Sequence, residues 1–210
     1  MQGDLDLAVV APLVAPGDTK LGGRAAVDLR GSGRARDPGA MALEGRAKLS
    51  NVSVESPARP KKIKQIEGDL SFSPARAAVS GLSARAGESS FTLDGTVARP
   101  LALLAKPESV PPAEVDFTLR SPHLDLAELL PRGPGVPLMP NARGGGRVAI
   151  ARLKNGKLDV ANVAANVRLS PAVLEVPDFG LDGYGGAVRG TARFDLRDAA
   201  RPVYAIHAKV

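Results

Sequence analysis

A strand-turn-strand pattern occurs twice in this chain, in residues 66–97 and again in residues 163–194. Both stretches contain a Ser-Pro turn followed by a Gly-Thr pair, with a slip of two residues between the landmarks, at 73–74 and 95–96 in the first and at 170–171 and 190–191 in the second. A β unit that repeats along a chain buries its apolar face against its neighbours, which favours an elongated sheet over a compact enzyme core. We therefore expect function to reside in a surface rather than in a catalytic cluster.

The composition is typical of a thin sheet. Apolar residues make up 44% of the 210 residues, but aromatic residues make up only 3%, so Ala, Val and Leu carry most of the hydrophobicity. Cysteine is absent, which excludes disulfide bonds, thiolate catalysis and Cys-based zinc sites. The net charge of +6 comes mostly from Arg residues that stand singly on alternating positions, a pattern typical of a solvated strand face rather than of a nucleic-acid patch.

Alternation of apolar and polar residues between Gly, Pro, Asp and Asn predicts on the order of ten to thirteen strands. In residues 91–97 the odd positions are apolar or Gly and the even positions are polar, as in a half-buried antiparallel strand. Alternation in residues 5–9 predicts a further strand near the N-terminus. Two tight turns are predicted where positive φ excludes most residues: Asn155-Gly156, as a type I′ hairpin, and Gly185-Gly186.

The middle of the chain has a different character. Pro is frequent in residues 100–112, alternation returns at about 114–120, and Asp125 with Glu128 predicts the capped start of a short helix at about 125–130. Residues 132–146 are rich in Pro and Gly and predict a flexible linker. We therefore expect three regions: an N-terminal antiparallel β unit at 1–100, a connector with one strand and a short helix at 101–143, and a C-terminal β repeat at 144–210.

Several short motifs follow one another in a fixed order. They are GDLSFS at 68–73, LDGTV at 93–97, SPHLDL at 121–126, NGKL at 155–158, YGG at 184–186, DLR at 195–197 and PVY at 202–204. No single motif is specific, because Gly-Gly turns and alternating strands are common. Together, their order and spacing resemble the repeat of the AsmA family of bacterial cell-envelope proteins, over residues 45–210.

The resemblance implies an all-β fold: an elongated, curled antiparallel sheet with an apolar inner face. It implies an exported protein of the periplasm or cell envelope, anchored in the inner membrane through a segment absent from this chain. Relatives are associated with moving phospholipid between membranes or with outer-membrane assembly. The expected partner is phospholipid or another membrane lipid, and no nucleic acid. The final strand alternates up to Val210 with nothing after it, which predicts a truncated repeat.

A lipid groove needs one continuous apolar face, because each acyl CH₂ withdrawn from water contributes about 0.8 kcal/mol. The same residues would serve as the ordinary closed core of a structural or scaffolding module that binds through edges and loops. Composition and alternation favour that core, whereas the resemblance favours the groove. An outer-membrane barrel segment is disfavoured by the missing aromatic girdles. The candidate lining residues are Phe72, Phe91, Leu93, Val97, Phe117, Leu119, Leu158, Val160, Leu169, Phe179, Leu181, Val188, Phe194 and Ile206.

The sequence contains no recognisable catalytic, cofactor or metal motif. His123 and His207 have no adjacent nucleophile and no clustered carboxylates. The stretch at 81–85 departs from Gly-x-Ser-x-Gly at its last position, and no phosphate-binding glycine motif stands between a strand and a helix. The basic run at 59–64 is compatible with contact to anionic lipid headgroups. We therefore predict a non-catalytic protein without catalytic residues, metal or cofactor.

Overall fold

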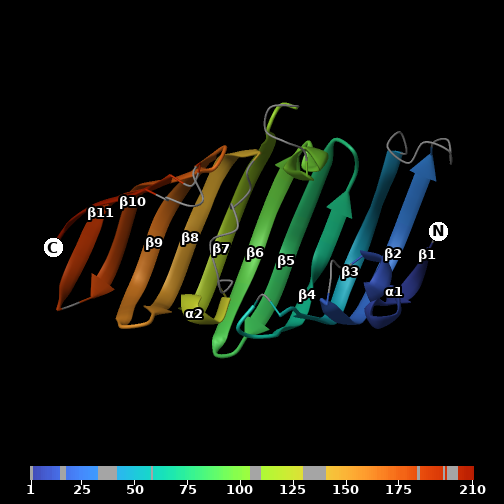
Figure 1. The fold of residues 1–210 in the computed structure, drawn as a ribbon, viewed down its shortest axis with the longest axis horizontal. Helices are drawn as coiled ribbons and strands as arrows, with labels where there is room; N and C mark the ends of the chain where they lie inside the picture. The colour runs from blue at the N-terminus through green and yellow to red at the C-terminus, as the bar shows by residue number, and fades with distance from the viewer. Residues whose placement is uncertain are drawn as a thin grey trace.

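The fold is one open, twelve-stranded sheet (Figure 1). The computed structural model describes residues 2–14, 18–32, 42–57, 59–104, 110–129, 141–183, 185–195, 197 and 203–210. The strands lie side by side in the order in which they follow along the chain, and β1 and β12 form the two edges. The predicted all-β fold, an elongated and curled antiparallel sheet with one short helix, is therefore confirmed as one open and mostly antiparallel sheet, which carries more than one short helical element.

The strands are five to fourteen residues long. They are β1 (Gln2–Asp6), β2 (Lys20–Ser32), β3 (Ala42–Glu55), β4 (Ile63–Phe72), β5 (Arg76–Ala86), β6 (Ser89–Ala98), β7 (Ala113–Asp125), β8 (Ala142–Asn155), β9 (Leu158–Ser170), β10 (Val173–Gly183), β11 (Gly186–Asp195) and β12 (Val203–Lys209). In the described part of the chain, three short helical elements interrupt them: α1 (Leu7–Val14), the 3₁₀ helix η2 (Pro100–Leu104) and α2 (Leu126–Leu129).

One pair of neighbouring strands is parallel. β7 and β8 run in the same direction, whereas the other ten neighbouring pairs are antiparallel. A parallel pair needs a long connection that returns the chain to the end where the first strand began. Alternation of side chains carries no information on strand direction, so this pair was not expected from the sequence.

The repeated sequence pattern corresponds to a repeated structure. Residues 66–97 lie in β4, β5 and β6, and residues 163–194 lie in β9, β10 and β11, so each copy is three consecutive antiparallel strands. With the strand on either side, the sheet contains two five-strand units, β3–β7 and β8–β12, which meet at the parallel pair. All three regions expected from the sequence contribute strands to this one sheet, and their boundaries stay a prediction.

The strand expected in residues 5–9 is wrong beyond Asp6. Residues 7–9 belong to α1, and Asp6 Oδ1 accepts a hydrogen bond of 2.9 Å from the backbone N–H of Ala8, which caps the helix. The apolar stretch from Leu7 onward is short and nearly continuous, so its periodicity does not separate a strand from a buried helix.

Part of the expected linker is a strand. Residues 142–146 begin β8, and Gly144 pairs with Val115 on one side and with Leu169 on the other. A run of glycines has no side-chain periodicity, so its strand character cannot be seen in the sequence. Residues 132–140 of the expected linker lie outside the described residues.

The two predicted turns form, with one change of type. Asn155 pairs with Leu158, so the central residues of this hairpin are Gly156 and Lys157, and only Gly156 has positive φ, at 59°. That pattern is type II′, not the expected type I′. In the second turn Gly185 has φ of 85° and Gly186 is already the first residue of β11; position 184 lies outside the described residues.

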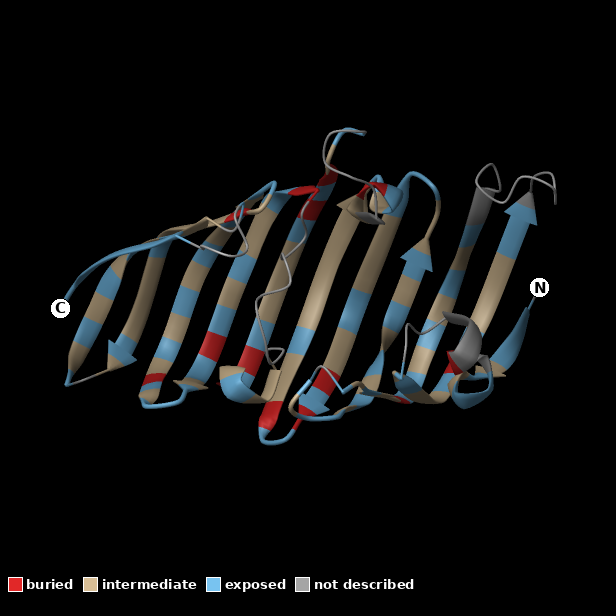
Figure 2. Ribbon diagram, in the orientation of Figure 1, coloured by how far each residue is buried: buried red, intermediate tan, exposed pale blue. Residues whose placement is uncertain are grey.

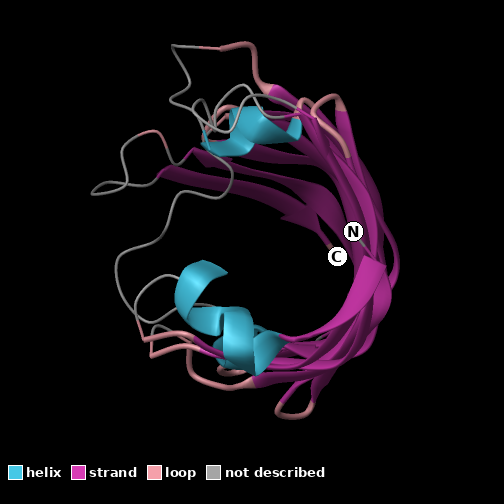
Figure 3. Ribbon diagram, turned by 90° about the vertical axis from the view of Figure 1, so that its right-hand side faces the viewer, coloured by secondary structure: helices cyan, strands magenta, loops and turns pink. Residues whose placement is uncertain are grey.

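The strands curve along their length, so the sheet forms a trough that is C-shaped in cross-section (Figure 3). β-Bulges lie at a similar level in several neighbouring strand pairs, and several residues at or beside these bulges have positive φ. A bulge bends its strand and increases the local twist. Because these bulges lie side by side, neighbouring strands bend at the same level and the whole sheet curves there. The positive-φ residues at or beside these bulges are Gly23, Asn51, Gln65, Gly81 and Asn162.

Burial is concentrated where the helical elements cover the ends of the strands. Ala86 and Ser89, beside α2, are 0% exposed, as is Ala113, beside η2. Figure 2 shows the buried residues near the strand ends, while the middle of the strands consists mainly of half-buried and exposed residues. The trough therefore has packed rims and an uncovered middle in the part of the chain that the structure describes.

Candidate functional site

The strand register aligns apolar residues into three rows that cross the sheet. The first row is Leu29, Gly45, Phe72, Ala77, Val97, Val115, Gly144, Leu169, Leu174, Phe194 and Tyr204. The second is Gly3, Val27, Ala47, Leu70, Val79, Gly95, Phe117, Gly146, Val167, Val176, Ala192 and Ile206. The third is Leu5, Ala25, Leu49, Gly68, Leu82, Leu93, Leu119, Val148, Ala165, Phe179, Gly190 and Ala208.

These rows define one face of the sheet, which we call the apolar face. None of the three rows contains a charged residue, and the hydroxyl of Tyr204 is their one polar side-chain group. Bulges interrupt the exact pairing between β4 and β5 and between β9 and β10, but the apolar residues resume on the same face beyond each bulge. A hydrocarbon surface thus runs from one edge of the sheet to the other.

The apolar face is the inner face of the trough. The helical elements lie on the concave side at its two rims (Figure 3), and the side chains that they bury belong to this face. Ala25 near α1 is 4% exposed, Ala86 near α2 is 0% exposed and Val115 near η2 is 7% exposed. The helices thereby narrow the mouth of the trough, and no other described element covers its floor.

All fourteen candidate lining residues lie on the apolar face. Nine of them are members of the three rows. The other five, Phe91, Leu158, Val160, Leu181 and Val188, continue the same face beyond the bulges. Val160 is 3% exposed, Ile206 is 61% exposed, and the remaining twelve are half-buried. The structure therefore brings together residues that are up to 134 positions apart in sequence.

The candidate list omitted most of the floor in the N-terminal strands and in β8. Val27, Leu70 and Val79 lie in the second row, and Val148 lies in the third. The same alternation that identified the phenylalanines is present around each of these residues, so the signal that locates them was available in the sequence.

Glycines beside the phenylalanines smooth the floor. A Cβ atom added to Gly146 would lie 2.6 Å from the ring of Phe117, and one added to Gly190 would lie 2.8 Å from the ring tip of Phe179. Each ring therefore covers the backbone of the neighbouring strand, which shields a glycine that has no side chain of its own. The result is a floor of ring faces and short aliphatic side chains.

The outer face carries complementary charges on neighbouring strands. Asp28 pairs with Arg46, and Glu175 lies between Arg168 and Arg193. Such pairs disfavour a one-residue slip, which would move every charge to the inner face.

Arginine side chains lower the pKa values of several carboxyl groups on this face, among them Asp159, which accepts hydrogen bonds from Arg152. Hydrogen bonds from Arg143 and then Arg99 hold the pKa of Glu114 below its ordinary value. A side-chain hydrogen bond from Arg197 lowers the pKa of Asp195 to about 2. Glu114, Arg99, Arg143 and Arg197 are exposed and Asp195 is half-buried, so these ion pairs keep the outer face charged at neutral pH.

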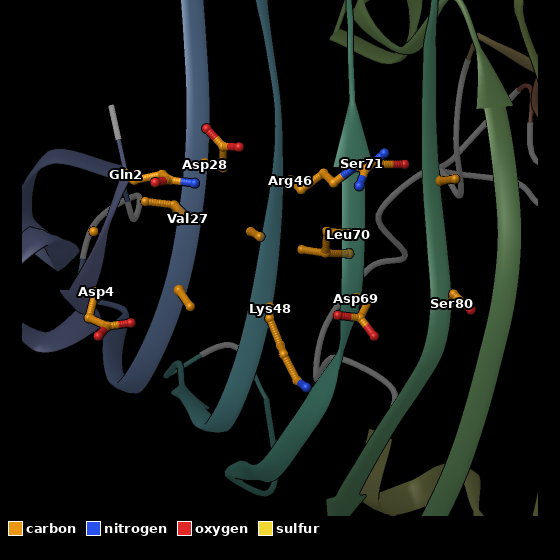
Figure 4. A pocket seen from close by; sticks show the side chains of 14 residues that line it. Gln2, Asp4, Val27, Asp28, Arg46, Lys48, Asp69, Leu70, Ser71 and Ser80 are labelled. Atoms are coloured by element: carbon orange, nitrogen blue, oxygen red, sulfur yellow. The ribbon is translucent and has the colours of Figure 1, made fainter.

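A depression of about 740 Å³ lies on the outer face (Figure 4). Two rows of side chains flank a strip of exposed backbone, and Arg46 reaches toward Ser71 while Lys48 lies near Asp69. The depression is shallow, open and charged on both sides. It therefore resembles the gap between rows of side chains on the convex face of a sheet.

Glu128 closes the rim of the trough at the parallel junction. Its Oε2 accepts hydrogen bonds from the backbone N–H groups of Glu88 and Ser89, both at 3.1 Å, and from Ser89 Oγ at 2.8 Å. Arg59 Nη1 donates to the backbone carbonyl of Leu129 at 3.2 Å and holds the end of α2. The capping box expected at this helix is therefore half formed: Asp125 Oδ1 accepts from Ala127 N–H at 2.9 Å, but Glu128 reaches to the β5–β6 hairpin instead of back to Asp125.

Replacing Glu128 by Ala is expected to lower the free energy of unfolding by about 1 to 3 kcal/mol, because the buried N–H and hydroxyl of Ser89 lose their acceptor. Burial raises the pKa of Glu128, but the hydrogen bonds from Ser89 and Glu88 and the charge of Lys61 outweigh it and hold that pKa below its ordinary value. The carboxylate therefore stabilises the fold at neutral pH, and this stabilisation is lost as pH falls below about 4.

Urea denaturation followed by circular dichroism at pH 7 and at pH 3 measures both effects. Glu88→Ala is the matched control, because the hairpin uses the backbone of Glu88 and its side chain is exposed. A loss of stability in Glu128→Ala that is equal at both pH values would contradict the role of the carboxylate.

The two histidines lie on the outer face, apart from each other. His123 pairs with Ser90 and His207 pairs with Thr191. The described residues contain no group of three or more His, Asp or Glu that could hold a metal ion. In the same part of the chain, no helix is long and apolar enough to span a membrane.

Comparison of the chain with protein-family models, with curated proteins and with solved structures gives no match. The apolar face of the trough, with its three continuous rows, is therefore the feature from which the function has to be derived.

Proposed function

We propose that this chain is a non-catalytic module of an AsmA-like protein of the bacterial cell envelope, and that its inner face shields the acyl chains of phospholipids. The module would serve lipid transport between membranes or outer-membrane biogenesis, as part of a periplasmic protein anchored in the inner membrane. The observation that supports this proposal is the set of three uncharged rows along the concave face.

The dimensions of the trough suit a lipid path. Twelve strands at a spacing of about 4.8 Å make the sheet about 53 Å long. One leaflet of a bilayer has a hydrocarbon depth of about 15 Å, half of the full core. The floor is thus longer than one acyl chain, so a chain that lies along it remains covered as it advances from strand to strand.

The half-exposed floor favours a ligand over a closed core. In a closed scaffold, the middle of the floor would be buried against a second layer, as core residues generally are. Phe117, Leu119 and Val148 are instead half-buried, and the described residues form one sheet with no second sheet against it. An uncovered hydrocarbon face of this extent marks a surface that binds an apolar partner.

Photo-crosslinking at neighbouring residues of β7 tests the proposal. A photoreactive amino acid at Phe117, on the floor, is expected to capture phospholipid in cells, whereas the same group at Thr118, half-buried on the outer face, is expected to capture none. Native mass spectrometry of gently purified protein should show bound phospholipid. Absence of lipid in both measurements, or equal capture at the two positions, would overturn the proposal and favour a scaffold.

A further inference from the structure

The rim of the trough that carries α2 is basic where β2, β4 and β5 reach it (Figure 1). Lys20 begins β2, Lys64 and Arg85 lie near the rim ends of β4 and β5, and the connection from β3 to β4 adds further cations. In this connection, Arg59 donates to the backbone carbonyl of Leu129 and so holds the connection against α2. The exposed cations that we call the basic rim are Lys20, Arg59, Lys61, Lys62, Lys64 and Arg85.

One ion pair involves this group in the part of the chain that the structure describes. Lys62 Nζ lies 3.8 Å from Glu55 Oε2, and a long contact between two exposed side chains contributes little stability. The other five cations have no carboxylate within ion-pair distance among the described residues. The carboxylate of Glu128, on α2, is occupied by hydrogen bonds from Ser89. The basic rim therefore keeps positive charge that the described residues do not pair.

The strand register places two of these cations directly opposite each other. Lys64 on β4 pairs with Arg85 on β5. Elsewhere in the described register, two charged residues that face each other on neighbouring strands are of opposite sign, with one exception. That exception, Arg189 beside Lys209, is also a pair of cations and lies toward the same rim. Like charges at opposite positions destabilise a sheet, so an anion bound between them would stabilise this rim.

We propose that the basic rim binds the anionic surface of a phospholipid membrane. The groups that it recognises are the headgroup phosphates, which accept charge-assisted hydrogen bonds from Lys and Arg. A cluster of several Lys and Arg side chains is the usual means by which a protein surface binds anionic lipid. The inference goes beyond the proposed function, because it concerns the rim and does not require lipid inside the trough.

The composition of the rim favours a membrane over a nucleic acid. Proteins that bind single-stranded nucleic acid stack its bases on aromatic side chains. Residues 18–20, 55–64 and 85–89 contain no aromatic residue. The basic rim is thus suited to a surface of phosphates without bases.

The basic rim adjoins the apolar face. Leu21, Val54 and Ile63 are register partners on β2, β3 and β4, are half-buried, and line the inner face just inside the rim. Ile63 stands between Lys62 and Lys64 in the chain. A headgroup held by either lysine would lie one residue, about 3.3 Å along the strand, from hydrocarbon side chains of the trough. The membrane would therefore meet the protein at the mouth of the trough.

Vesicle flotation tests the proposal. Vesicles of phosphatidylcholine and phosphatidylglycerol in equal parts are expected to bind the chain at least about tenfold more tightly than vesicles of phosphatidylcholine alone. Added salt should release the protein, because interactions between exposed charges are screened beyond about 10 Å at 0.1 M ionic strength. Equal binding to the two kinds of vesicle, or none to either, would overturn the proposal. Binding to a single-stranded oligonucleotide without binding to the anionic vesicles would assign the rim to nucleic acid instead.

Removal of charge tests whether the basic rim is the contact. The variant K61Q/K62Q/K64Q is expected to bind the anionic vesicles about a hundredfold more weakly, about fivefold for each cation. Arg59 is left in place because it holds α2. The circular dichroism spectrum should stay that of the unchanged chain, since the three replaced side chains are exposed.

The matched control R24Q/K48Q/R147Q removes the same charge from exposed positions on the outer face, away from this rim. Its vesicle binding is expected to stay within about threefold of the unchanged chain. An equal loss in the two triple variants would show that net charge alone acts, and the docking proposal would then be wrong. Photo-crosslinking at Phe117 reports on the trough separately, so lipid capture there without vesicle binding would reject the docking and leave the proposed function standing.

Discussion

Gly144→Ala is expected to lower the free energy of unfolding by about 3 kcal/mol or more. Gly144 has φ of 129°, a conformation that residues with a side chain rarely adopt. A Cβ atom at this position would lie 1.9 Å from the carbonyl oxygen of Val115 on β7, so the two strands would have to separate. The site lies at the parallel junction between the five-strand units, and the strain therefore weakens the connection between the two halves of the sheet.

Urea denaturation followed by circular dichroism measures this loss, and two other glycines serve as controls. Gly156→Ala introduces a side chain at φ of 59° but meets no atom within 4 Å, so it is expected to cost about 1 kcal/mol. Gly3→Ala, with neither constraint, is expected to stay within about 0.5 kcal/mol. A Gly144→Ala variant as stable as Gly156→Ala would contradict the close approach of β7 and β8.

Val148→Asp is expected to abolish lipid retention while leaving a folded protein. Val148 lies in the third row on the floor of the trough, half-buried and between Leu119 and Ala165. A carboxylate here stays hydrated in the open trough, and an acyl chain would have to displace that water, so the amount of copurified phospholipid should fall more than tenfold. The lost burial of Val148 should cost about 1 to 2 kcal/mol of stability.

Ala149→Asp is the matched control on the same strand. Ala149 is exposed on the outer face, where its neighbour in register on β7 is Arg120, so the new carboxylate faces water and a positive charge. Both stability and lipid content should stay as in the unchanged protein. If Val148→Asp instead lowered stability by about 3 to 5 kcal/mol, the floor would be a closed core with no hydration for a charge.

Strand positions and side-chain faces were largely predictable, because both depend on neighbours along the chain. Phe91, Leu93 and Val97 share a face with Phe179 and Phe194, as alternation predicts. The failures fall where the local signal is weak. Residues 7–9 form a helix within a nearly continuous apolar stretch, and residues 142–146 form a strand although three consecutive glycines have no face.

Other features depend on contacts between distant residues. The Glu128 carboxylate could equally have capped its own helix, and only the position of the β5–β6 hairpin directs it to Ser89. The parallel direction of β8 likewise follows from where the chain returns after α2 and not from any residue of β8 itself. The hydrogen-bond partner of Glu128 and the direction of β8 each depend on two elements at once, whereas the sequence pattern predicts each element separately.

The amino-acid sequence alone specifies a two-faced β chain: period-two alternation is a local property, so each strand has one uncharged side and one charged side whatever its neighbours are. Only the tertiary structure decides that the uncharged sides become the inside of a trough, since this requires twelve strands in register and bulges that bend them at a common level. The same alternation would serve a closed core. The curvature of the sheet, which arises from pairing between strands, makes the uncharged side the inner face of an apolar trough.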